Sequence, residues 1–220
     1  AYGLAIDAAG RIIVAGTRTD ADGGEDIFAV RLTAGGVLDA GYGTGETAGF
    51  AVVNVDAEEN LPDRAYDALA AGAGVLVAGC TQLPDGSLDA AVVRLDAQGV
   101  LDTGFDTDGI AYWDRSGGVG WDMGYRLAAD AGGYAYLAGT CAAGPGDSQF
   151  VLTKFDAGTG AVAGGFGADG VAWWNGGDGV DEVHGLVLDG TDLLVAGYSR
   201  DGDGEEFDAA FARFDSAGAL

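Results

Sequence analysis

Several residue types are nearly missing from this chain of 220 residues, which has one His, one Met, two Cys, three Pro and a single Lys, Lys154. A lone histidine, His184, excludes a multi-histidine metal site. Lys and Arg number 10 against 35 Asp and Glu, a formal net charge of −25. Because this charge repels phosphate backbones and anionic lipids, we expect no nucleic-acid partner. No apolar run reaches the length of a membrane span, so we expect no membrane insertion.

Motifs of known enzyme classes are also missing. The chain has no Gly-x-Ser-x-Gly elbow, and its Gly-rich segments lead into apolar strands where Walker and dinucleotide motifs would need helices. Carboxylates are abundant, but no pair stands out by its spacing. We therefore expect no catalytic residues, no enzyme activity and no cofactor, with calcium as the one ion to consider.

Glycine is plentiful, with 42 residues, and the chain repeats one phrase four times. A second phrase, a cation followed by Leu or Phe, keeps the same step of about 60 residues. Self-similarity at a long fixed period indicates an array of supersecondary units. The copies are Val14-Ala15-Gly16, Val77-Ala78-Gly79, Leu137-Ala138-Gly139 and Val195-Ala196-Gly197, and then Arg31-Leu32, Arg94-Leu95, Lys154-Phe155 and Arg213-Phe214.

Each repeat contains up to four short apolar runs separated by Gly- and Asp-rich turns, and helical periodicity appears nowhere. In the second repeat the runs cover residues 66–70, 75–77, 91–93 and 110–113. Continuous apolar runs of this length favour strands that are buried on both faces. These features predict an all-β fold, a β-propeller of four-stranded antiparallel blades with about 60 residues per repeat.

We expect a single domain over residues 1–220, with blades at approximately 1–61, 62–120, 121–179 and 180–220. The fourth repeat ends soon after its third run and lacks a fourth strand. Open strand edges invite pairing, so this edge favours a segment of a larger propeller or assembly over a complete ring of four blades.

The repeat resembles the bacterial delta-60 repeat, a domain of unknown function. The resemblance rests on residues 11–16, 66–70 and 91–96, and on the long run from Gln98 to Gly109. Repeat three departs from it, with Gly160-Ala161-Val162-Ala163 where Gly-x-Leu-Asp is expected. The resemblance implies a β-propeller in secreted or surface-attached bacterial proteins, often beside adhesion modules, and it brings no catalytic residues.

Two aromatic pairs, Tyr112-Trp113 and Trp173-Trp174, take corresponding places in repeats two and three. The structural interpretation is packing between blades, because neighbouring strand residues face opposite sides. The functional alternative is a platform on which a sugar stacks, which Trp121 and Tyr125 could extend.

Two acidic loops follow second strands and contain Asp20, Asp22, Asp26, Asp201 and Asp203. An Asp-x-Asp-Gly turn can direct oxygens at calcium, but the bidentate Glu of a full calcium loop is absent. Turn formation with solvated charge is the simpler interpretation.

Several further positions are interpreted as structural or left open. His184 takes the place of Tyr2, Tyr66 and Tyr125 in the other repeats, so we expect it to pack as they do. The recurrent cation of each blade should pair with a nearby Asp. Cys80 and Cys141 follow the repeated phrase with an offset of one residue, so they can form a disulfide unless strand alternation separates them.

These observations predict a non-catalytic extracellular or cell-surface propeller that acts as a structural, adhesive or ligand-presenting module. Its partners would be a protein, a glycan or identical subunits that meet through the open blade edge. The alternative is a carbohydrate-active enzyme or lectin that uses the carboxylates and aromatics of a propeller face.

Overall fold

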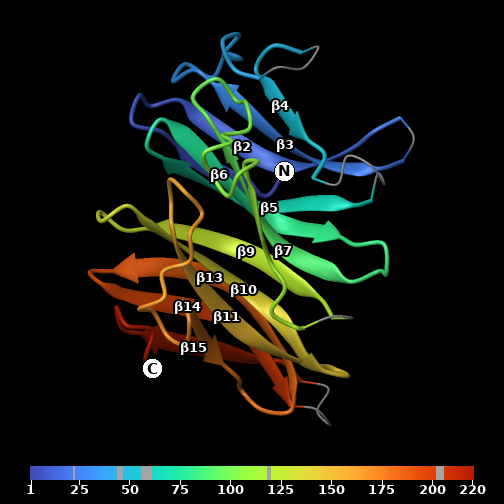
Figure 1. The fold of residues 1–220 in the computed structure, drawn as a ribbon, viewed down its shortest axis with the longest axis vertical. Coiled ribbons are helices and arrows are strands. Elements are labelled where there is room, and N and C mark those ends of the chain that lie inside the picture. The colour runs from blue at the N-terminus through green and yellow to red at the C-terminus, as the bar shows by residue number, and fades with distance from the viewer. Residues whose placement is uncertain (22, 44–46, 56–60, 118–119, 202–205) are drawn as a thin grey trace.

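The computed structural model describes residues 1–21, 23–43, 47–55, 61–117, 120–201 and 206–220, and these contain strands but no helix. The strands form four antiparallel sheets that follow one another from the N-terminal to the C-terminal end (Figure 1). The first sheet holds β1 (Gly3–Ile6), β2 (Ile12–Thr19), β3 (Glu25–Leu32) and β4 (Phe50–Val53). The second holds β5 (Asp63–Ala71), β6 (Gly74–Gln82), β7 (Leu88–Leu95) and β8 (Ile110–Trp113).

The third sheet holds β9 (Asp122–Ala129), β10 (Tyr134–Gly144), β11 (Asp147–Asp156) and β12 (Val171–Trp174). The fourth holds β13 (Gly179–Asp189), β14 (Asp192–Asp201) and β15 (Asp208–Phe214). Strands are paired in chain order within every sheet, and the fourth sheet has three strands among the described residues. The prediction of an all-β chain built from antiparallel sheets is confirmed.

Three hydrophobic clusters lie between successive sheets and explain why the middle strands are apolar throughout. In β6, Val75 and Val77 pack against the first sheet, whereas Leu76 and Ala78 pack against the third. Since alternate residues of a strand face opposite sides, both sets are buried only when the strand is covered twice. The third cluster joins the third and fourth sheets through residues such as Leu152 and Val195.

The repeated glycine has a steric cause. The first strand of the second sheet has a β-bulge between Ala65 and Asp67, opposite Gly79 and Ala78. A β-carbon on Gly79 would overlap the carbonyl oxygen of Arg64 and lie 2.8 Å from its carbon. Gly139 and Gly197 meet the carbonyls of Met123 and Glu182 in the same way. The phrase therefore ends in glycine because the bulged strand approaches too closely for any side chain.

Polar groups connect neighbouring sheets at repeated positions. The Thr17 hydroxyl accepts a hydrogen bond from the Ala65 amide at 3.2 Å, and the Thr140 hydroxyl accepts one from the Val183 amide at 3.0 Å. Each hydroxyl follows the repeated glycine, and each bonds to the first strand of the next sheet. These bonds fix the stacking of one sheet on the next.

The recurrent cations pair with aspartates as expected and also reach the next repeat. Arg31 donates to Asp39 at 2.8 Å and to the Ala97 carbonyl at 2.6 Å, while Arg94 donates to Asp102 at 2.8 Å and to the Ala157 carbonyl. Arg213 pairs with Asp192 at 2.8 Å. The exception is Lys154, which lies 4.7 Å from the ring centre of Tyr134 in a cation–π contact.

The two cysteines are buried free thiols, so the structure does not form the disulfide considered above. The offset of one residue explains this, because it places Cys80 at the position of Thr140 and Cys141 at the position of Thr81. Their neighbours differ accordingly. Cys80 lies 3.9 Å from the Tyr66 hydroxyl, whereas Cys141 packs with Val151.

Candidate functional site

A row of aromatic side chains follows the first strands of the sheets, which are neighbours in space. Ring centres of Tyr2 and Tyr66 are 6.1 Å apart, and those of Tyr66 and Tyr125 are 5.0 Å apart. Tyr66, Tyr125 and His184 each occupy the extra residue of a β-bulge, which redirects a side chain from the regular alternation of the strand. His184 takes the corresponding register position, and its ring packs on Tyr198, with ring centres 5.2 Å apart.

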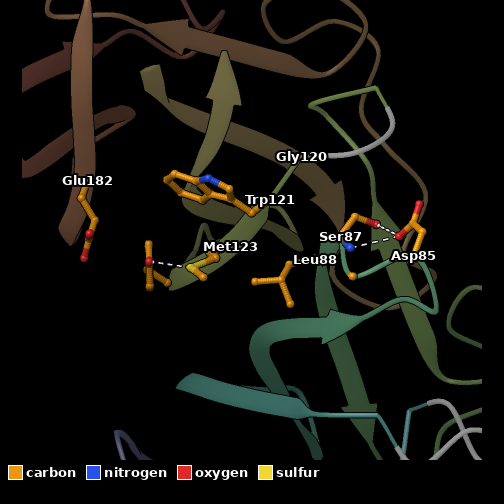
Figure 2. A pocket seen from close by; sticks show the side chains of 9 residues that line it. Asp85, Ser87, Leu88, Gly120, Trp121, Met123 and Glu182 are labelled. Atoms are coloured by element: carbon orange, nitrogen blue, oxygen red, sulfur yellow. Dashed lines mark hydrogen bonds between the residues drawn. The ribbon is translucent and has the colours of Figure 1, made fainter. Parts of the chain in front are cut away.

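A pocket of about 550 Å³ lies beside this row, between the second, third and fourth sheets (Figure 2). Trp121 and Met123, at the start of β9, form its centre, and Leu88 of β7 borders it. Asp85 contributes a carboxylate from the β6–β7 turn and Glu182 contributes one from β13. The full lining is Asp85, Gly86, Ser87, Leu88, Gly120, Trp121, Met123, Tyr125 and Glu182.

Hydrogen bonds hold the start of β9 and the end of the β6–β7 turn in place around the pocket. The Leu88 amide donates a hydrogen bond to the Gly120 carbonyl at 3.2 Å, and Leu88 and Trp121 form a parallel β-bridge. The Tyr125 hydroxyl donates to the Met123 sulfur at 2.7 Å. The half-buried indole of Trp121 is therefore held on a rigid strand end.

Both carboxylates of the pocket have polar partners. Asp85 accepts hydrogen bonds from the Ser87 amide at 3.0 Å and the Ser87 hydroxyl at 2.6 Å, and the hydroxyl bond lowers the pKa of Asp85. Glu182 accepts from the Tyr198 hydroxyl at 2.6 Å and lies 3.3 Å from His184 Nε2. Burial raises the pKa of Tyr198 to about 12, with the bond to Glu182 adding to the effect. This pocket therefore presents fixed acceptors beside an aromatic face.

The four aromatics predicted as a sugar platform lie in different environments. Trp113 is 7% exposed and packs on Phe155 at 5.2 Å, within the cluster between the second and third sheets. Trp174 packs on Phe150 at 4.7 Å in the next cluster. Trp173 contacts the small cluster around Cys141. Tyr112 is 40% exposed, so the structure does not join the four in one exposed platform.

The acidic loops predicted to bind calcium are described only in part. Asp22 and Asp203 lie outside the described residues, as does the side chain of Asp201. Asp20 accepts a hydrogen bond from the Gly24 amide at 2.8 Å, as in a turn. Asp26 is 4% exposed and pairs with Arg18 at 2.9 Å. The partner of Asp26 is thus a cation supplied by the chain.

Sequence reasoning missed Asp85, Met123 and Glu182, although it named Trp121 and Tyr125 as possible extensions of an aromatic surface. The signal that could have found Glu182 is its place in the repeat, two residues before His184, since Met123 stands two residues before Tyr125 in the same way. Asp85 lies in a Pro-Asp-Gly turn, and turn chemistry alone explains its presence.

Four antiparallel sheets stacked face to face, with their first strands side by side, are the architecture of β-propeller blades. Two segments, residues 10–42 and 75–105, match the family model described as a domain of unknown function (DUF5122) beta-propeller. This match confirms the resemblance to a β-propeller repeat family of unknown function. No curated protein sequence matches the chain.

Among solved structures, one titled "Crystal structure of a thermostable family-43 glycoside hydrolase" aligns over 100% of this chain and 73% of its own, with 9% identity and a TM-score of 0.49. In the described part of the chain, no helix is long and apolar enough to cross a membrane.

Proposed function

We propose that this chain is a non-catalytic, ligand-presenting β-propeller module of a bacterial secreted or cell-surface protein. The pocket around Trp121 carries the proposal, because it joins a half-buried indole to two fixed carboxylates on rigid strands. Both carboxylates already accept hydrogen bonds from neighbouring side chains, which suits binding better than proton transfer. The charge of −25 and the resemblance to surface proteins support the same role.

The ligand class that fits this pocket is a neutral glycan. An indole face stacks on the C–H groups of a sugar ring, and carboxylate oxygens accept hydrogen bonds from sugar hydroxyls. The test is affinity electrophoresis on a panel of polysaccharides. Wild type should be retarded by at least one of them, and Trp121→Ala and Glu182→Gln should lose that retardation while keeping the circular dichroism of the wild type. Tyr112→Ala, an exposed aromatic elsewhere, is the matched control and should bind normally.

A carbohydrate-active enzyme is the alternative function, since the same carboxylates could act on a bound glycan. Incubation of the panel with wild type, followed by an assay for reducing ends, separates the two. Retardation without release of reducing sugar supports the lectin-like module. If wild type releases reducing sugar and Glu182→Gln does not, the carbohydrate-active enzyme replaces the lectin-like module as the proposed function. If no polysaccharide retards the wild type, the glycan proposal fails.

The outer faces of the two end sheets support a role in assembly as well. Leu4 and Ile6 of β1 are each 67% exposed, and Phe211 of β15 is 75% exposed beside an apolar hollow of about 460 Å³ that includes Val187 and Leu194. Corresponding faces of the inner sheets are covered by the next sheet. The proposed occupant of these faces is the end sheet of a second copy, which would continue the stack of sheets.

Light scattering over a range of concentrations tests this assembly. The expected result is a concentration-dependent mass that Phe211→Ser reduces to that of one chain. A wild type that remains one chain at high concentration would contradict association between copies.

A further inference from the structure

Three carboxylates gather at one end of the second sheet, apart from the loops and the pocket discussed above. They are Asp89 in β7, Asp114 directly after β8 and Asp122 at the start of β9, and each offers an oxygen within 4.8 Å of the others. Asp122 is 1% exposed, Asp89 is half-buried and Asp114 is exposed. Three negative charges this close repel one another unless a cation lies between them.

The same three places occur in the neighbouring repeats, which permits an internal comparison. Strand pairing aligns Asp89 with Asp26 and Gln149, because their cross-strand partners are Thr81, Arg18 and Cys141. It also aligns Asp122 with Asp63 and Asp181, the first or third residues of their strands. The residue after the fourth strand is Asp114 here and Asn54 or Asn175 elsewhere.

The neighbouring repeats reduce this repulsion with their own residues. In the first repeat, Arg18 pairs with Asp26 at 2.9 Å and Asn54 replaces one carboxylate. In the third repeat, Gln149 and Asn175 are both amides, so a single carboxylate remains. The second repeat has three carboxylates, and Thr81 stands where the first repeat has Arg18. Among described residues, no Lys or Arg lies within ion-pair distance of the three, although the half-buried guanidinium of Arg115 interacts electrostatically with Asp122 and Asp114.

Two buried oxygens at this end of the sheet also lack partners. Asp122 Oδ2 accepts from the amides of Arg115 at 2.7 Å and Ser116 at 3.0 Å, but Asp122 Oδ1 is buried with no hydrogen bond. The hydroxyl of Thr81, cross-strand from Asp89, is likewise buried without a partner. Asp181 Oδ1, the corresponding atom of the third repeat, is also buried without a hydrogen bond, so the Thr81 hydroxyl beside the three carboxylates is what distinguishes this copy. A buried oxygen without a partner costs free energy, which a ligand at this place would recover.

From this geometry we infer that Asp89, Asp114 and Asp122 form a binding site for one calcium ion. Calcium takes oxygen ligands at about 2.3–2.6 Å, so oxygens up to roughly 5 Å apart can share one ion. Magnesium requires about 2.0–2.1 Å and would need the side chains to move closer. Waters at the exposed Asp114 side would complete the coordination. Burial raises the pKa of Asp89 and of Asp122, and the charge of Asp114 raises both further, a cost that a bound cation would remove.

The chain itself supplies a variant that should fold without binding calcium. Asp89→Gln/Asp114→Asn reproduces the residues of the third repeat, Gln149 and Asn175, at the same register positions. A matched control, Asp178→Asn/Asp208→Asn, removes two exposed carboxylates elsewhere, so that nonspecific attraction to the acidic surface is reduced equally.

Isothermal titration of chelator-treated protein with calcium chloride, together with thermal melts, tests the inference. Wild type and control should bind one calcium per chain, and Tm should rise by about 5–10 °C at a hundredfold excess over Kd. The double variant should melt as a folded protein, bind no calcium and show no shift. Binding that survives in the double variant would overturn the assignment, as would a folded wild type that gives neither heat nor shift.

Discussion

Gly139→Ala tests the steric origin of the repeated phrase and its link to the pocket. A β-carbon at this position would overlap the Met123 carbonyl oxygen, lie 3.0 Å from the carbonyl carbon and lie 3.3 Å from the α-carbon of Gly124. All three atoms belong to the backbone of the bulge, so no side-chain rotation relieves the overlap. The bulge that carries Tyr125 must move instead.

Overpacking in a well-packed region lowers the free energy of unfolding by about 1–3 kcal/mol, and by more where the backbone must shift. We expect about 3 kcal/mol at Gly139, because the overlapped oxygen and the two crowded carbons all belong to the backbone of one strand. For a domain of this size, that corresponds to a fall in Tm of about 6–12 °C. Movement of Met123 and Tyr125 should also weaken any glycan retardation that the pocket gives.

Differential scanning calorimetry measures the effect, and Gly164→Ala is the control. A β-carbon on Gly164 meets nothing within 4 Å, so its variant should stay within about 0.5 kcal/mol of wild type. Neither glycine has a positive φ, so backbone strain does not distinguish them. If the Gly139→Ala and Gly164→Ala proteins melt within about 2 °C of each other, a difference of about 1 kcal/mol or less, the steric account is refuted.

Three further predictions concern the thiols, the bonds between sheets and the response to acid. Burial raises the pKa of Cys80 to about 11 and of Cys141 to about 12, so a disulfide reagent at pH 8 should label neither in the folded protein and both in guanidinium; fast labelling of the native protein would contradict this. Thr140→Val leaves the Val183 amide without its acceptor and should cost about 1–3 kcal/mol in urea unfolding, with faster hydrogen exchange at Val183, whereas unchanged exchange would argue against the bond. The hydrogen bond from Arg94 lowers the pKa of Asp102, so the folded state binds this proton more weakly than the unfolded state and the pair stabilises the fold above the ordinary carboxyl pKa. Asp102→Asn should therefore lower the free energy of unfolding at pH 6 by less than about 1 kcal/mol for this partly exposed pair, measured as a lower Tm. The difference should vanish as pH falls below 3.8, through the lowered pKa, and a difference that persists there would point to packing.

The sheets could be predicted well from the sequence because the strand pattern recurs in four repeats along the chain. Val77-Ala78-Gly79 marks a middle strand, and alternation along it explains burial on both faces once neighbours are stacked. The bulge could not be predicted, because Tyr66 fits an ordinary strand pattern and only the pairing register shows that it is the extra residue. The same bulge is what aligns the aromatic row beside the pocket.

The partners of an acidic residue are set by strand pairing as well as by its place in an acidic loop. Asp26 belongs to a loop-like run of carboxylates, yet strand pairing places it opposite Arg18, which lies eight residues earlier in the chain. Asp89 and Asp122 are distant in sequence and belong to no motif. They meet because Leu88 and Trp121 form a parallel bridge, a contact that no local pattern encodes.

In a repeat protein, the copies of a position serve as controls for one another. Arg18, Thr81, Cys141 and Ser199 occupy one column of the middle strands, and only Arg18 carries a charge. If the carboxylates beside this column were simply solvated, the number of carboxylates in a repeat would not depend on the residue that the repeat has in the column. Instead, the copy with three carboxylates has the polar but uncharged Thr81, and the buried Thr81 hydroxyl lacks a partner. A cation from solution supplies there the charge that Arg18 supplies in the first blade, which is why the double variant that copies the third blade decides the question.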